Sequence, residues 1–372
     1  GEPAPAGGGS APAATPRRAA YAGIDLYDPG RFPTAVDLSD NTSRFGMSPA
    51  AARVLASLDP EHVTRYPSVF AAELKETLAE ALGLAPENIA TGCGSDDLID
   101  SAVRAFAEPG EMLAYPEPTF GMVPTFGRMN ALRPVPVPWR LDAGLDAEAL
   151  LATRARITYV CRPNNPTGTL AERSAVERLE RDTPGVVLVD EAYADFAGDD
   201  MAAWAASSRR AIVLRTFSKA YGLAGLRVGW AVGPAPLIRE LEKSRGPYKV
   251  GGPAAAAAVA AVREDATWLT DVLRRTRENR ERLAAALRER GLFPLPSAAN
   301  FLLVPLPAPL RAGTVAGALR RRGVQVRPFP ALAGIGDALR VSVGPWEQME
   351  AFLGALAGAL EQASVNTDLG GR

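Results

Sequence analysis

The chain has 372 residues, 47% of them hydrophobic, and a formal net charge of −1. This length allows a large core in one or two domains, and the balanced charge gives no basis for binding nucleic acid or a membrane surface. No apolar run approaches the length of a membrane span. Two cysteines and one histidine predict no disulfide framework, a reducing cytoplasmic setting and no histidine-based metal site.

The N-terminal residues 1–20 are rich in Ala, Pro and Gly and show no hydrophobic periodicity. We therefore expect a disordered leader there and a flexible tail over 366–372. The pair Arg17 and Arg18 is not followed by the apolar segment of a twin-arginine export signal.

A strand and a turn are predicted over 37–46, and a helix is predicted to follow. Ser48 is a favourable N-cap and Pro49 suits the first helical position. Tyr66 lies between an arginine and a proline. Taken alone, it reads as an ordinary half-buried tyrosine.

A glycine-rich turn at 92–97 precedes a helix predicted over 98–107. Free N–H groups at such a helix N-terminus bind phosphate, and Gly94, Ser95 and Asp96 are placed to do so. Asp96 is explained equally well as a plain N-cap. Phe120 follows a further predicted strand, where an aromatic side chain usually belongs to the core.

Two buried strands are predicted at 157–161 and 186–189, and polar residues follow each. After the first, residues 163–168 read Pro-Asn-Asn-Pro-Thr-Gly, a string of turn formers. After the second comes Asp190, and a carboxylate at the carboxyl end of a parallel strand faces the ligand crevice of an open α/β sheet. A helix cap is the alternative for Asp190, but Tyr193 three residues later favours the crevice.

The segment 216–227 lies between predicted strands at 212–214 and 228–232. Its polar anchors are Thr216, Ser218, Lys219 and Arg227. A loop lysine is ordinarily a solvated surface cation. A desolvated lysine, however, forms a Schiff base with a carbonyl compound, and an arginine fork matches a phosphate. The combination predicts a site for pyridoxal 5′-phosphate (PLP).

The C-terminal third is predicted to be an Ala-rich helical region with a break near Asp265, followed by a small α+β unit. Within this unit, predicted strands at 324–327 and 339–344 alternate with period two. They carry Arg327 and Arg340. An arginine on the polar face of a strand is most often merely solvated.

These strings together resemble the fold-type I PLP-dependent aminotransferases, and best of all the histidinol-phosphate aminotransferase group, over about residues 36–360. The resemblance implies an α/β fold with a mostly parallel seven-stranded sheet sandwiched by helices. This large PLP-binding domain is expected over 46–250, and a smaller α+β domain over 21–45 and 251–365.

The resemblance also implies a role for each cofactor residue. Lys219 forms the Schiff base, Asp190 pairs with the pyridinium nitrogen, and Tyr193 is the third catalytic residue. Tyr193 and Asn165 hydrogen-bond the phenolic oxygen. The residues expected to hold the phosphate or stack on the ring are Gly94, Ser95, Asp96, Thr216, Ser218, Arg227 and Phe120. Tyr66 is expected to reach the phosphate of a neighbouring subunit, which implies a homodimer with shared active sites.

On the substrate side, the resemblance implies that Arg340 grips a carboxylate and that Arg327 binds a distal phosphate. Asn41 and Asn165 complete this side. The chain departs from the family at 41–46, where Asn-Thr-Ser-Arg-Phe-Gly replaces the usual Asn-Pro-Tyr-Gly continuation, and at Lys249, where relatives carry a small polar residue. These departures leave the amino donor open.

The implied function is ping-pong transfer of an amino group between histidinol phosphate or an aromatic amino acid and 2-oxoglutarate, through a Lys219 Schiff base, as in histidine biosynthesis. A decarboxylase similar to threonine-phosphate decarboxylase has the same fold and motifs and stays an alternative. A non-catalytic PLP-fold sensor is a remote alternative. The intact Lys219, Asp190 and Arg340 and the absence of a basic patch disfavour it.

Overall fold

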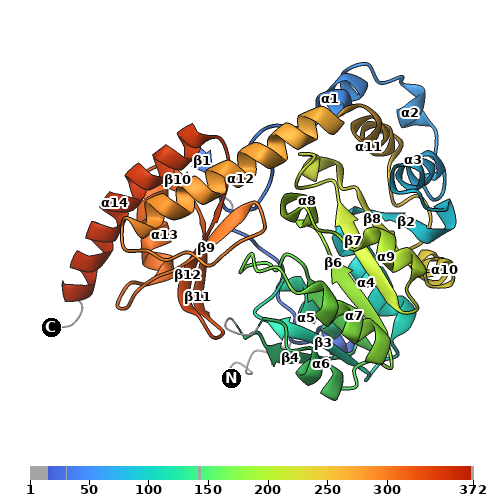
Figure 1. Cartoon of the computed structure of the whole chain (residues 1–372), viewed down its shortest axis with the longest axis horizontal. Coiled ribbons are helices and arrows are strands. Elements are labelled where there is room, and N and C mark those ends of the chain that lie inside the picture. Colours follow the sequence, from blue (N-terminus) through green and yellow to red (C-terminus); the bar gives the residue numbers. More distant parts are fainter. Residues whose placement is uncertain (1–15, 31, 141–143, 370–372) are drawn as a thin grey trace, which may run out of the picture.

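The structure is a computed structural model that describes residues 16–30, 32–140 and 144–369 (Figure 1). Most of the expected leader, residues 1–15, lies outside the described residues, as do residues 370–372 of the expected tail. In the described part of the chain, no helix has both the length and the apolar character needed to cross a bilayer.

A large twisted sheet forms the centre of the right-hand body in Figure 1. Among the described residues it has seven strands in the order β2-β8-β7-β6-β5-β3-β4. They are β2 (Ile89–Gly92), β3 (Met112–Glu117), β4 (Arg133–Pro138), β5 (Ile157–Cys161), β6 (Val186–Asp190), β7 (Ala211–Thr216) and β8 (Gly229–Val232). Strand β8 is antiparallel to β2 and β7, and the other neighbouring pairs are parallel. The predicted mostly parallel seven-stranded α/β sheet is thus confirmed.

Helices cover both faces of this sheet, which explains why its central strands are mostly apolar. Val187 and Val189 point into one layer and Leu188 into the other. The first layer contains α1 (Pro49–Ala56), α3 (Ala72–Leu82), α6 (Ala147–Ala152), α7 (Arg173–Asp182), α9 (Ala202–Ser207) and α11 (Gly252–Glu264). The second contains α4 (Gly94–Phe106), α5 (Met122–Met129) and α10 (Ala235–Ser244).

A smaller body lies on the left of Figure 1 and has its own core. Its three-stranded antiparallel sheet has the order β11-β12-β9, and a separate short strand pair joins β1 to β10. The strands are β1 (Val36–Asp37), β9 (Phe301–Pro305), β10 (Val324–Gln325), β11 (Arg327–Leu332) and β12 (Gly336–Ser342), and the helices are α13 (Ala312–Arg321) and α14 (Trp346–Leu369). The strand predicted at 324–327 is therefore divided at Val326, because the chain passes there from the pair with β1 to the pair with β12.

The long helix α12 (Ala266–Arg288) runs from the large body to the small one (Figure 1). It is separated from α11 at Asp265, as predicted. The Asp265 carboxylate accepts hydrogen bonds from the Ser48 hydroxyl and, at 3.0 Å, from the Ala50 N–H. The break between the helices therefore also caps the start of α1.

Candidate active site

Asp190, Tyr193, Asn165 and Lys219 lie at or just after the carboxyl ends of β5, β6 and β7. Asp190 is the last residue of β6 and is buried. Its Oδ2 accepts a hydrogen bond from the Tyr159 hydroxyl at 2.6 Å, and its Oδ1 accepts one from the Ala192 N–H at 3.1 Å. Burial raises the pKa of Asp190 to about 6, and these two donors oppose the rise. The carboxylate is therefore mostly ionised at neutral pH and can face a protonated ring nitrogen.

Lys219 lies in the loop after β7. Its Nζ donates to the Asp40 carbonyl oxygen at 3.1 Å and lies 5.8 Å from the centre of the Tyr193 ring. Desolvation and, to a smaller extent, the positive charge of Arg340 lower the pKa of Lys219 to about 8. About one amine in ten is then neutral at pH 7, which makes Lys219 a competent nucleophile and base.

A cradle for an anion forms where α4 begins. Gly94 has φ +80°, and a Cβ there would lie 2.5 Å from the Arg227 Nη2, so only glycine lets the guanidinium lie against this helix end. Arg227 Nη1 donates to the Ser218 hydroxyl at 3.4 Å, and the Thr216 and Ser218 hydroxyls are 2.9 Å apart. The first turn of α4 contains Gly94, Ser95 and Asp96. Hydroxyls, a guanidinium and a helix N-terminus together fit a phosphate.

Two arginines mark the side of the site formed by the small body. Arg327 and Arg340 are register partners on β11 and β12, so their side chains share one face of the sheet. Arg340 is 8% exposed; it donates to Asn165 Oδ1 at 2.6 Å and to the Ser39 carbonyl at 2.7 Å, and its Nε has no partner. Arg327 donates to the Pro29 carbonyl at 2.7 Å. Burial and the charge of Arg327 lower the pKa of Arg340. A bound anion would stabilise the charged guanidinium against both the loss of hydration and the repulsion from Arg327.

Asn41 links the two sides. This buried residue donates from Nδ2 to the Tyr193 hydroxyl at 3.2 Å and contacts Ser342 of β12. Phe120 lies between β3 and α5 and packs against the core layer that contains α4. The structure therefore gathers Lys219, Asp190 and Tyr193 with the two arginines.

Tyr66 is the predicted site residue that lies apart. It follows α2 (Glu61–Thr64), is 84% exposed and stacks on Tyr248 at 4.8 Å. Val63, Val69 and Phe70 are also exposed in the segment around it. Within one chain, Tyr66 lies on the surface.

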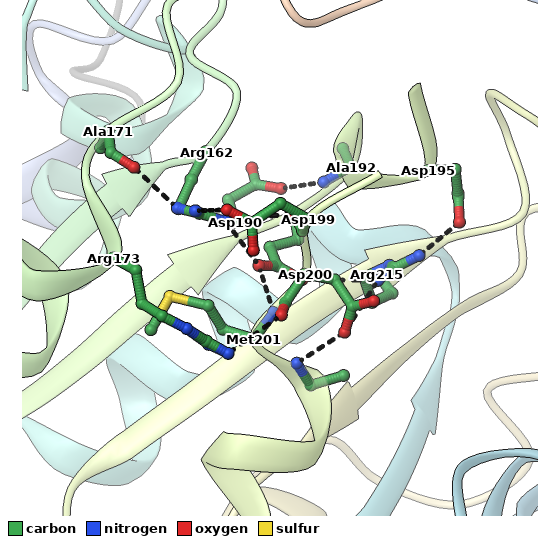
Figure 2. Close-up of polar contacts among 12 residues, drawn as sticks. Arg162, Ala171, Arg173, Asp190, Ala192, Asp195, Asp199, Asp200, Met201 and Arg215 are labelled. Carbon is green, nitrogen blue, oxygen red and sulfur yellow. Dashed lines mark hydrogen bonds and ion pairs between the residues drawn. The ribbon is translucent and has the colours of Figure 1, made fainter. Parts of the chain in front are cut away.

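The sequence interpretation gave no role to a buried ionic cluster beside Asp190. Glu191 has no exposed surface and lies 3.6 Å from Arg162 and 3.4 Å from Arg215. Figure 2 shows these two arginines, which also pair with Asp199 and Asp195, each at 2.5 Å. The available signal was that charged residues follow β5 and β6 directly and interrupt the apolar strand β7.

Tyr159 was likewise missed, because a tyrosine inside an apolar strand reads as core. The usable signal was register: Cys161 of β5 pairs with Asp190 of β6, and Tyr159 precedes Cys161 by two residues on the same face. Among the described residues, no group of three or more potential His, Cys, Asp or Glu ligands gathers for a metal ion.

Comparisons with known proteins agree with this geometry. The family model for aminotransferase class I and II matches residues 33–356. A histidinol-phosphate aminotransferase of Erythrobacter litoralis is 37% identical over 362 residues, which cover 92% of this chain and 96% of the relative. An aromatic amino acid aminotransferase of Rhodococcus jostii is 36% identical over 363 residues, or 94% and 98% of the two chains. The crystal structure of histidinol-phosphate aminotransferase from Sinorhizobium meliloti in complex with pyridoxal-5'-phosphate has a TM-score of 0.81 and 28% identity, and the match covers 88% of this chain and 92% of that one.

Proposed function

Because the chain belongs to the aminotransferase class I and II family and is a PLP-dependent aminotransferase, we propose that its amino donor is histidinol phosphate and its acceptor 2-oxoglutarate. The observation that supports this pair is the arrangement of Arg327 and Arg340 on one face of adjacent strands. Histidinol phosphate carries a phosphate ester where an amino acid carries its carboxylate, and 2-oxoglutarate carries two carboxylates. Both half-reactions therefore present an anion to these arginines.

The residues fit PLP. We propose that the cradle of Arg227, Ser218 and the α4 N-terminus holds its phosphate and that Asp190 faces its ring nitrogen. Bound PLP supplies an electron sink for negative charge that develops at the substrate Cα. Keeping the ring nitrogen protonated is the task of the Asp190 carboxylate. Lys219 Nζ takes the Cα proton as general base and returns a proton as general acid.

An aromatic amino acid is the second candidate donor. The relative from Rhodococcus jostii carries that name, and Phe329 and Phe301 flank the Arg340 guanidinium at 5.6 and 5.5 Å. These rings would suit an apolar donor side chain.

A single-turnover experiment separates the two donors. The visible band of the PLP enzyme is followed after mixing with histidinol phosphate, unphosphorylated histidinol or phenylalanine. Fastest loss with histidinol phosphate supports the proposal, and faster loss with phenylalanine replaces it. The variant Arg327→Ala should lower kcat/KM for histidinol phosphate by roughly 10- to 100-fold and for phenylalanine far less. Release of carbon dioxide without a keto product would contradict transamination.

We further propose a C2 homodimer in which Tyr66 completes the partner's phosphate cradle. The exposed side chains of Tyr66, Val63, Val69 and Phe70, all within segment 63–70, support this assembly, because large apolar side chains gathered on a surface mark interfaces. Mixing Tyr66→Phe with Lys219→Ala subunits is the sharpest test. If Tyr66 acts across the interface, mixed dimers contain one site with both changes and one unaltered site. Activity should then appear on mixing two weakly active variants. If Tyr66 acts within its own chain, mixing restores nothing.

Two further proposals concern the location of the protein and its division into domains. The chain is proposed to work in the cytoplasm, which its free thiols Cys93 and Cys161 support. A two-domain division close to the one expected is supported by separate cores. One is built from residues between 51 and 261, and the other from residue 38 and residues between 283 and 363.

A further inference from the structure

Asn41 uses every polar group it has on neighbours that belong to different parts of the molecule. Its backbone N–H donates to the Ser342 hydroxyl at 3.0 Å, and its Oδ1 accepts from that hydroxyl at 3.0 Å. Its carbonyl oxygen accepts from Asn300 Nδ2 at 3.0 Å, and its own Nδ2 donates to the Tyr193 hydroxyl at 3.2 Å. Asn41 also has φ +59°, a conformation that asparagine and glycine tolerate better than other residues.

Proton accounting fixes which way the Asn41 amide faces. Ser342 has no exposed surface, so its hydroxyl proton needs an acceptor within the protein. Asn41 Oδ1 accepts this proton, 3.0 Å from the Ser342 hydroxyl oxygen. If the amide were turned over, Nδ2 would face Ser342, whose proton would lose this acceptor. The amide NH2 group of Asn41 therefore faces Tyr193.

This orientation decides what the Tyr193 hydroxyl can do. It has one proton, and toward Asn41 it can only accept. Its own proton is thus free to point away from Asn41. Burial raises the pKa of Tyr193 above its usual range, so the proton is retained at neutral pH. The ring is held edge-on by Phe301 at 5.1 Å. The charged and titratable groups that face it are Asp190, Cys161, Lys219 and Arg340.

We propose that Asn41 is a positioning residue, which makes Tyr193 a hydrogen-bond donor toward the phenolic oxygen of PLP and ties that donor to strand β12. The inference rests on the proposed function, because it takes Tyr193 as a cofactor residue. Ser342 lies two residues after Arg340 on β12. Arg340 donates to the carbonyl oxygen of Ser39, which precedes Asn41 by two residues. The anion-binding arginine and the tyrosine hydroxyl are therefore connected through one short segment of chain.

The test is a pH titration of the visible absorbance of the PLP enzyme. A hydrogen bond donated to the phenolic oxygen stabilises its negative charge and lowers the pKa of the lysine-bound cofactor. Asn41→Asp replaces the donor facing Tyr193 with an acceptor, so the midpoint should rise by about one unit. Asn41→Gly keeps the backbone conformation without the amide and should give a smaller rise. PLP affinity, measured separately by fluorescence, should fall in the same order.

Double variants distinguish a role through Tyr193 from a general one. In a Tyr193→Phe background, Asn41→Gly should cause no additional shift. An equal shift with and without Tyr193 would overturn the inference. If Tyr193→Phe alone leaves the midpoint unchanged, the cofactor role of Tyr193 fails instead. Thr276→Val is the matched control, since it removes a buried hydroxyl bond to Val272 within α12 and should not move the midpoint. Thermal melting of each cofactor-free variant checks that it folds.

Discussion

The carboxyl edge of the large sheet and the strand pair β11–β12 hold their charged groups in different ways. At the sheet edge, partners are fixed: Asp190 has the Tyr159 hydroxyl and the Ala192 N–H, and Glu191 has two arginines. On the strand pair, Arg340 is held by neutral oxygens and keeps one nitrogen unpartnered.

The difference suits one chain to a ligand that stays bound and a ligand that comes and goes. A guanidinium binds a carboxylate or phosphate more strongly than a neutral carbonyl, so an incoming anion can displace the Ser39 and Asn165 oxygens from Arg340. The partners of Asp190 lie on the same body and need not move. In the proposed assignment, the groups that face the cofactor are thus pre-organised, and Arg340 exchanges its partners when substrate binds.

Lys219 touches both regions, and removing it should have the largest effect. In Lys219→Met, transamination should fall by roughly 10⁴-fold or more, because the base and the covalent anchor are both lost. The measurement is single-turnover loss of the visible band. Retained turnover in this variant would refute the role of Lys219.

The same variant should gain stability without cofactor. The folded pKa of Lys219 is lowered to about 8 from an ordinary value of 10.5. Between these values the unfolded chain binds more protons, so stability rises with pH across that window, and below about 8 the buried charge costs stability. At pH 7, Lys219→Met should raise the unfolding free energy by roughly 2–3 kcal/mol, measured by urea denaturation. The gain should shrink above pH 9.

Arg340→Lys tests whether Arg340 must bind the substrate anion through two parallel hydrogen bonds. Lysine keeps the charge but cannot bind an anion with two parallel bonds. A loss of about 2–4 kcal/mol in transition-state binding is expected, which is roughly a 30- to 1,000-fold fall in kcat/KM. PLP affinity should be unchanged, since Arg340 is proposed to bind the substrate and not the cofactor. A fall in PLP affinity would break the division between the two regions.

Glu191→Gln tests the charged groups at the carboxyl edge of the large sheet, whose partners are fixed. The amide can still bond the Met201 N–H, but Arg162 and Arg215 lose their shared anion. Each arginine keeps an aspartate partner, Asp199 or Asp195, so the fold should be destabilised by about 1–3 kcal/mol, read from urea midpoints. Glu148→Gln is the control, because its partner Arg178 is 3.7 Å away at the surface and no measurable change is expected.

The pH dependence of PLP capture connects the two regions. Only the neutral Lys219 amine attacks, so the capture rate should rise about tenfold per pH unit up to about 8 and then level off. In Arg340→Gln a neighbouring positive charge is lost, the pKa of Lys219 rises, and the plateau should begin at higher pH. An unmoved plateau would show that Arg340 does not act on Lys219.

Lys249→Asn should have the smallest effect. Lys249 pairs with Asp97 at 2.9 Å on the flank of the cradle and is one-third exposed. Such a pair contributes about 0–1 kcal/mol, so unfolding midpoints and PLP affinity should barely change. A loss of PLP affinity beyond tenfold would make Lys249 part of the cradle.

The sequence could predict the large sheet because its strands are short apolar runs that end in turn formers or charges, as at Asp190. It could not distinguish a core tyrosine from a donor, since the role of Tyr159 depends on which strand lies beside β5. Nor could it link Asn41 to Ser342. Those residues are 301 positions apart, and only the pairing of distant segments brings them together. The division at Val326 has the same origin, because a change of pairing partner leaves no mark on local periodicity.

The pairing of β1 with β10 also has a consequence for folding during synthesis, because the two strands are far apart in the chain. Val36 is synthesised long before its partner Val324. The large sheet is complete by residue 232, and α11 packs against α1 soon afterwards. Strand β1 therefore has no β10 partner until Val324 has been made, even when the large sheet has already folded. During translation the nascent chain would expose this segment to chaperones until the small sheet forms.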